Sequence, residues 1–156
     1  MPNSLLKARI GVAERHARIL ERVLEALCTS LPIQPEDLEK EDELLLLRLD
    51  QFQSRFSKLQ DHIGARVFPA VLDALGEDAA SMSVLDRLYR LEALGFVEDA
   101  EIWNDLRAVP NQLAHDYPED ADTLTTELGI ALDSARTLLR TWRFLLEKIE
   151  KHPLLA

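Results

Sequence analysis

The sequence predicts an all-α fold, an antiparallel bundle of four to five helices that forms a single domain over residues 1–156. Apolar residues recur at alternating spacings of three and four along three long segments, which is the period of one helical face. Period-two alternation rich in Val, Ile and Thr, which is typical of strands, is absent from the sequence. The 156 residues are 47% hydrophobic and 29% charged, a balance that excludes intrinsic disorder and fits one core.

The first long helix is predicted over 4–29. Its apolar stripe consists of Leu6, Ile10, Ala13, Ala17, Leu20, Leu24 and Leu27. Pro32 and Pro35 lack amide donors and disfavour helix in the residue before each of them, so we expect the helix to end there in a loop.

The second long helix is predicted over 37–63. Its stripe consists of Leu45, Leu49, Phe52, Phe56, Leu59 and Ile63. Gly64 and Pro69 interrupt this pattern, yet apolar residues continue it as far as Gly76. We therefore expect either a kinked extension or a short separate helix after residue 63.

Two shorter helices are predicted next. Ser83 with Asp86 three residues later is typical of a helix start, so we expect a helix over 84–94 that stops at Gly95. A fourth helix is predicted over 98–117, because acidic side chains at its start complement the positive end of the helix dipole. Its apolar positions are Ile102, Leu106, Val109 and Leu113.

The last helix is predicted over 119–151, with its apolar stripe in a heptad rhythm. At 1.5 Å per residue, a helix of some thirty residues is about 45 Å long. The stripe consists of Leu124, Leu128, Ala131, Ala135, Leu138, Trp142, Leu145 and Ile149. We assign this stripe, like the others, to the core of the bundle.

Charge and cysteine content narrow the classes of function. The net charge of −10 repels a phosphate backbone, so broad nucleic-acid binding is disfavoured while a local basic site stays open. Cys28 is the only cysteine, which excludes an internal disulfide, and we expect it to be a small buried hydrophobe. No apolar run approaches the roughly 20 residues of a membrane span and no secretory signal is evident, so we expect a cytoplasmic protein.

The histidines do not form a metal-binding pattern. No second His or Cys stands at ligand spacing from any of them, and no Gly-rich phosphate loop is present, so neither a metal nor a cofactor is expected. We expect His16 and His62 to be solvated on helix surfaces, and His152 to lie in a frayed tail.

The segment 106–118 carries the strongest functional pattern. On a straight helix Arg107, Asn111 and His115 are each four residues apart, so they share one face. There the guanidinium can stabilise a phosphate charge and the imidazole can exchange a proton near neutral pH. The alternative, which the spacing alone favours, is that Asn111 and His115 satisfy a backbone kink produced by Pro110.

Residues 111–117, Asn-Gln-Leu-Ala-His-Asp-Tyr, resemble the Arg-Asn-x-x-x-His-x-Tyr signature of the HEPN superfamily. The resemblance is to the HepT-type toxins and the related nucleotidyltransferase substrate-binding proteins in particular. The order of elements is similar too: two long helices, a short one, a helix with Trp103 that runs into the motif, and a long final helix. The resemblance thus covers most of the chain.

The resemblance implies a helical bundle that forms a homodimer and sets the motifs of both subunits in a shared cleft. Active members cut RNA without a metal, with the motif His and Arg acting on the phosphodiester. HepT-type toxins are paired with a small nucleotidyltransferase antitoxin, and the motif tyrosine can be adenylylated. By position, His115 matches the motif histidine, Asn111 its polar partner and Tyr117 the tyrosine.

Pro110 departs from the family pattern, because it stands where the family has its arginine. Proline cannot supply the charge that a phosphorane-like transition state requires, and Arg107 is the nearest substitute. Eight acids surround this one cation: Glu98, Asp99, Glu101, Asp105, Asp116, Glu119, Asp120 and Asp122. We therefore expect ribonuclease activity to be weak or lost, and RNA to be disfavoured as a ligand.

Tyr117, with Asp116 beside it, is the expected contact point with the nucleotidyltransferase and the expected modification site. It directly precedes Pro118, where the helical ladder stops and the ring is accessible. The alternative is a tyrosine packed over the end of the bundle.

Two alternatives also remain for the function: an active metal-independent ribonuclease toxin that uses Arg107 and His115, and a non-catalytic helical interaction protein.

Overall fold

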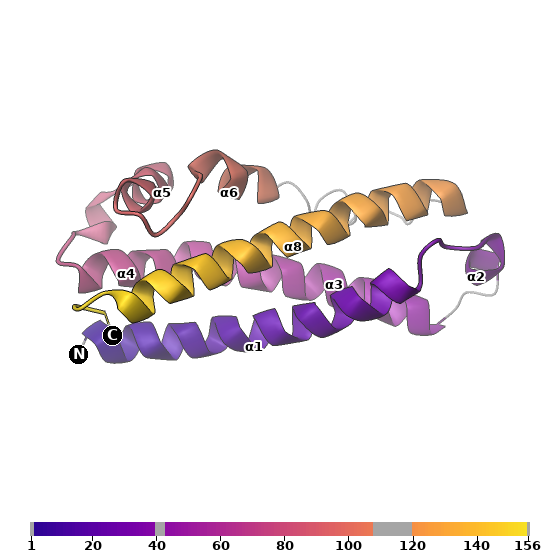
Figure 1. Ribbon diagram of the computed structural model, residues 1–156, viewed down its shortest axis with the longest axis horizontal. Coiled ribbons are helices and arrows are strands. Elements are labelled where there is room, and N and C mark those ends of the chain that lie inside the picture. The colour runs from indigo at the N-terminus through magenta and orange to yellow at the C-terminus, as the bar shows by residue number, and fades with distance from the viewer. Residues whose placement is uncertain (1, 40–42, 108–119, 156) are drawn as a thin grey trace.

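The described part of the chain is a bundle of three long helices with shorter elements along one side (Figure 1). The computed structural model describes residues 2–39, 43–107 and 120–155. α1 (Pro2–Thr29) runs antiparallel to both α3 (Glu43–His62) and α8 (Ala121–Lys151), so the two termini lie at the same end. The described residues contain no strand, and the predicted all-α bundle is confirmed. None of their helices has the length and apolarity that crossing a membrane requires.

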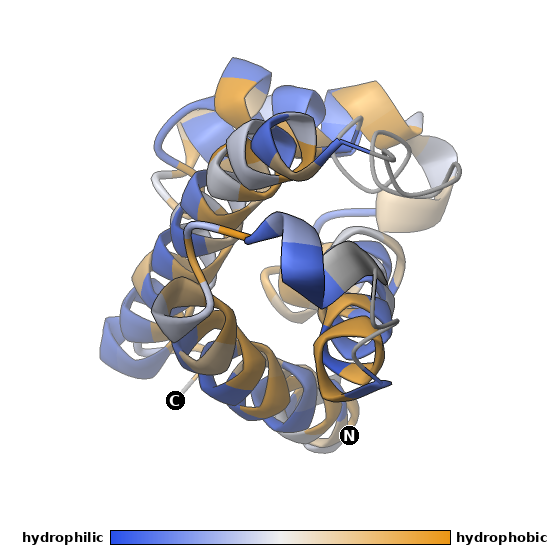
Figure 2. Cartoon of the chain, turned by 90° about the vertical axis from the view of Figure 1, so that its right-hand side faces the viewer, coloured by the Kyte–Doolittle hydropathy of each residue, from blue (hydrophilic) through white to orange (hydrophobic). Residues whose placement is uncertain are grey.

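The apolar stripes predicted from the sequence form the core. Every stripe residue of the second and last predicted helices is buried, and on α1 only Ile10 is partly exposed. Figure 2 looks along the bundle and shows apolar and polar stretches alternating along each long helix. This is the pattern that results when one face of a helix is buried and the other is solvated.

The region after α1 differs from the prediction of one helix over 37–63. α2 (Pro35–Glu39) is a separate short helix that lies off the axis of α3. At the far end of α3 the chain passes through a π-helix, η1 (Ile63–Val67), into α4 (Phe68–Ala74). The backbone stays helical from α3 through η1 into α4, so an extension of the second helix, interrupted by a π turn ahead of Pro69, is the alternative that holds.

The first of the two short helices begins where the sequence predicts and ends within one residue of the prediction. α5 (Val84–Ala93) starts at Ser83, whose Oγ accepts a hydrogen bond from the Asp86 amide at 3.0 Å. After α5, Gly95 takes a positive φ of 87°, a conformation that glycine adopts without strain. Together with the 3-10 turn η2 (Ala79–Ser81), α5 covers the side of α4.

α6 (Ala100–Leu106) covers the first part of the predicted fourth helix, and the rest of that helix lies outside the described residues. Asp99 caps it by accepting a hydrogen bond from the Glu101 amide at 2.9 Å. The prediction for Ile102 is wrong, because this residue is exposed while Trp103 beside it is buried. The helix is turned by one residue so that the larger apolar surface of Trp103 enters the core.

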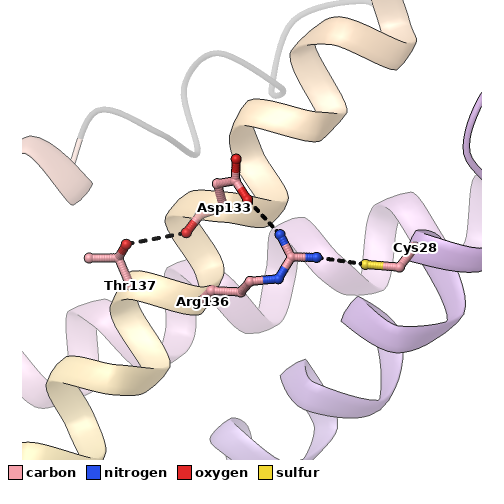
Figure 3. Close-up of polar contacts among 4 residues, drawn as sticks. All are labelled: Cys28, Asp133, Arg136 and Thr137. Atoms are coloured by element: carbon pink, nitrogen blue, oxygen red, sulfur yellow. Dashed lines mark hydrogen bonds and ion pairs between the residues drawn. The ribbon is translucent and has the colours of Figure 1, made fainter.

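Polar contacts join α1 to α8 alongside the apolar core. The Trp142 indole donates a hydrogen bond to Glu14 at 2.5 Å. Arg136 donates to Asp133 on its own helix and, at 2.9 Å, to the Sγ of Cys28 on α1 (Figure 3). The prediction that Cys28 is a small buried hydrophobe holds only in part: it packs against the core but is half-buried, and its thiol accepts a hydrogen bond from a guanidinium.

The histidine predictions are also wrong. His16 and His62 are half-buried between α1 and α3, where His16 binds Arg55 and His62 binds the Arg9 carbonyl. His152 is half-buried, with its ring centroid 5.8 Å from that of Phe96. Each imidazole thus exchanges water for a specific partner, which the spacing of residues along one helix does not reveal.

Candidate functional site

A cleft of about 510 Å³ opens where α5 and α6 meet the junction of α3, η1 and α4. Its polar and charged lining residues are Ser57, Gln60, Asp61, Arg87, Asn104 and Arg107. Its apolar lining residues are Gly64, Ala65, Phe68, Val84, Leu88 and Trp103. The mixture of apolar walls with a few convergent polar groups is typical of a ligand site.

The walls of the cleft follow from local helix geometry. On α3, Ser57, Gln60 and Asp61 stand three and four residues apart, so they share the face that looks away from α1. The π-helix continues this wall, and π turns inside helices occur frequently at functional sites. A Cβ on Gly64 would lie 3.6 Å from the Trp103 ring, so η1 and α6 are in close contact at the base of the cleft.

Gln60 is the unusual residue in this wall. Its side chain is only 5% exposed, and its Nε2 has no hydrogen-bond partner among the described residues. A buried polar group without a partner costs about 1–3 kcal/mol. An acceptor oxygen on a molecule bound in the cleft would remove this cost, so the position of Gln60 favours a polar ligand.

Two arginines make the described lining of the cleft cationic. Arg87 is held by its own Nε, which donates to the Ala79 carbonyl at 2.8 Å. Arg107 follows the last residue of α6 and is exposed, at a helix end where a positive charge is favourable. Asp61 is the acid among the lining residues, so the two guanidinium groups outnumber it and favour an anionic group.

The described acids of the predicted negative rim do not line this cleft. Of the eight, Asp116 and Glu119 lie outside the described residues, and the other six are absent from the lining. Asp99 and Asp120 cap α6 and α8 instead. Hydrogen bonds from the Thr123 hydroxyl and then the Asp122 amide lower the pKa of Asp120 below its ordinary value, as expected of a capping carboxylate.

The structure tests the predicted site residues only in part. Arg107 lines the cleft, whereas Pro110 and the motif residues Asn111, His115, Asp116 and Tyr117 lie outside the described residues. The convergence of Arg107, Asn111 and His115 on one face therefore stays a prediction.

Sequence reasoning singled out Arg107 and missed four lining residues that the site depends on: Gln60, Arg87, Trp103 and Asn104. Trp103 and Asn104 precede Arg107 by four and three residues, so helical spacing could have grouped them with it. Arg87 is twenty residues away on another helix and belongs to no motif, so only the packing of α5 against α6 brings it here.

Comparisons of the chain with protein-family models, with curated proteins and with solved structures find no match. The assignment of a function therefore depends on the cleft and on the motif that follows α6.

Proposed function

We propose that this chain is a HEPN-type component of a prokaryotic toxin–antitoxin module, that it works with a small nucleotidyltransferase partner, and that its ribonuclease activity is weak or lost. The observation that carries this proposal is the cationic cleft at the end of α6. Arg107 lines it beside Arg87, and the motif residues 111–117 follow Arg107 within ten positions of the chain.

The arrangement of the helices supports the proposal. Two long helices, α1 and α3, precede the short α5, the Trp-containing α6 and the long final α8. The resemblance to the HEPN superfamily implies the same order of long and short helices. A plain helical interaction protein does not require a cleft with two arginines against one acid and an unsatisfied buried amide, and this favours a site over a purely structural bundle.

The chemistry of the cleft is binding and orientation of an anionic group. The Arg107 guanidinium can hold a phosphate through two parallel hydrogen bonds, and Gln60 and Asn104 offer amide donors beside it. His115 would supply proton transfer in any residual RNA cleavage. Without an arginine at position 110, the motif lacks one cation near His115. We therefore propose that the chain forms a homodimer, that it binds the nucleotidyltransferase partner, and that it cuts RNA poorly.

One observation favours the second candidate, an active metal-independent ribonuclease. Arg107 is exposed next to a second arginine, so the cleft can hold a phosphodiester even though Pro110 cannot. In that case Arg107→Ala and His115→Ala would each abolish cleavage. Measurement of RNA cleavage in the presence of a chelator separates the two candidates.

Co-purification tests the proposed partnership. We expect a nucleotidyltransferase reading frame next to the gene of this chain, and its product should co-elute with the chain when the two are co-expressed. Tyr117→Ala should weaken the complex about tenfold or more if the ring is a central contact. Tyr89→Ala is the matched control, because Tyr89 is the other tyrosine of the chain and is exposed on α5. An isolated gene, or separate elution of the two proteins, would contradict the proposal.

A further inference from the structure

A second group of polar residues lies between α1 and α3, on the side of α3 away from the cleft. We call it the basic seam and define it as Arg15, His16, Arg55, Lys58 and His62. The Arg55 Nη1 is 2.9 Å from the Nδ1 of His16. The His62 ring lies edge-on to that of His16, with centroids 6.4 Å apart. Two helices thus place three permanent cations and two imidazoles along one seam.

Among the described residues no acid acts on His16, although the chain carries a net charge of −10. The titratable groups that act on it come from α1 and α3 and are Arg55, His62, Lys58 and Arg15. Two acids of α1 have partners on α8 instead, since Glu14 accepts a hydrogen bond from Trp142 and Glu21 pairs with Arg143. On α3, Asp61 lines the cleft. Like charges held this close repel one another, and a bound anion would relieve the repulsion.

The hydrogen bonds fix the protons of the two imidazoles. Arginine only donates, so the Nδ1 of His16 accepts and its proton stands on Nε2. A carbonyl only accepts, so the Nε2 of His62 donates to Arg9 at 2.8 Å. The Nε of Arg55 is buried without a partner among the described residues, so this guanidinium is incompletely satisfied by His16 alone.

We infer that the basic seam binds an oxyanion of the phosphate class, with Arg55 and His16 at its floor and Lys58 and Arg15 at its exposed rim. Arg55 turns its outer donors from the neutral His16 ring to the oxyanion, because a charge-assisted bidentate contact is stronger than a bond to a neutral nitrogen. The Nδ1 of His16 is then free to take up a proton. The inference is independent of the proposed function, since none of these residues lines the cleft or belongs to the motif.

A divalent metal is the other ligand that a pair of imidazoles commonly binds. Among the described residues no three His, Cys, Asp or Glu side chains are grouped closely enough to hold a metal ion. The three permanent cations Arg15, Arg55 and Lys58 would also repel a metal. The seam therefore fits an anion.

Proton uptake gives the site a signature that a structural role of Arg55 would not produce. Burial, and then the nearby Arg55, lower the pKa of His16 from its ordinary value. A bound dianion raises that pKa, so the complex holds more protons than the free protein. Linkage then requires sulfate to bind more tightly as the pH falls from about 8 to about 5.5. Sulfate is the chosen probe because its own charge does not change over this range.

The test is a titration of the full chain with sodium sulfate, followed by ¹⁵N resonances of the histidine rings and by calorimetry. We expect saturable binding that tightens on acidification, together with a raised pKa of His16. Arg55→Gln should weaken binding about tenfold or more. Lys58→Gln removes an exposed cation of the rim and should weaken binding without endangering the fold. Arg18→Gln, which changes an exposed residue of α1 outside the seam, is the matched control and should bind sulfate as the wild type does. Arg107→Gln removes sulfate bound in the cleft and should leave the response of the His16 ring unchanged.

Four probes at equal ionic strength distinguish the sources of the oxyanion: sulfate, inorganic phosphate, oligodeoxythymidylate and a poly-glutamate peptide. Binding of sulfate and inorganic phosphate supports a free oxyanion, and binding of oligodeoxythymidylate that Lys58→Gln weakens supports a phosphodiester backbone. Binding of a poly-glutamate peptide alone would overturn the inference, because it would identify a carboxylate partner. Absence of saturable binding, or binding that neither Arg55→Gln nor Lys58→Gln changes, would overturn it as well.

Discussion

Replacement of Trp142 by alanine is expected to lower the free energy of unfolding by about 3–5 kcal/mol. Trp142 is 1% exposed in the middle of the stripe that α8 packs against the rest of the bundle. Its removal leaves a cavity and also leaves Glu14 without the indole donor. Because domains of this size are stable by about 5–15 kcal/mol, the variant should unfold at a much lower urea concentration than the wild type.

Two variants separate the causes of this loss. Trp142→Phe removes the hydrogen bond and only part of the buried ring, so its loss should be smaller, near 1–3 kcal/mol. Arg140→Ala changes an exposed neighbour on the same helix and should stay within about 0.5 kcal/mol of the wild type. Urea denaturation monitored by circular dichroism measures all three. A loss below about 1 kcal/mol for Trp142→Ala would show that α8 is not the central core helix.

The second large effect concerns RNA cleavage. The wild type is expected to cut RNA weakly or not at all, and Pro110→Arg is expected to raise the rate by about 100-fold or more. The added guanidinium would stand where the family has its arginine, one position before Asn111 and five before His115. Cleavage of a labelled RNA in the presence of a chelator measures both rates.

Pro110→Gln is the matched control for this gain. It removes the ring and restores an amide hydrogen without adding a charge, so it should leave cleavage near the wild-type rate. In the Pro110→Arg background, His115→Ala should abolish the gain because the proton-transfer group is lost. Fast metal-independent cleavage by the wild type, abolished by Arg107→Ala, would favour the active-toxin alternative instead.

The long helices could be predicted because their packing depends on local periodicity. Every predicted stripe residue of α8 is buried, and Ser83 and Gly95 mark the bounds of α5 within a residue. The wrong predictions concern the places where the chain departs from a straight α-helix or where contacts between elements decide which face is buried. The π turn at Ile63–Val67 and the turned face of α6, with Trp103 inside and Ile102 outside, depend on contacts between elements rather than on spacing.

Only the part of the candidate site that lies within one segment of the sequence could be predicted. The spacing of Arg107 to Asn111 and His115 singles it out, and it lines the cleft. The contributions of Gln60 and Arg87 arise from α3 and α5, so no single stretch of sequence contains them together. His16 and Arg55 are likewise 39 residues apart and meet only because α1 and α3 are antiparallel.

Adenylyl transfer tests the central claim most directly. The chain is incubated with the nucleotidyltransferase encoded beside its gene, Mg²⁺ and ATP, and the modified residue is mapped by peptide mass spectrometry. The proposed partnership predicts an adenylyl group on Tyr117 that Tyr117→Phe removes and that Tyr89→Phe leaves unchanged. Labelling only at other residues, or labelling that persists in Tyr117→Phe, would remove Tyr117 from the site. A chain that neither binds the nucleotidyltransferase nor accepts the adenylyl group would contradict the partnership itself.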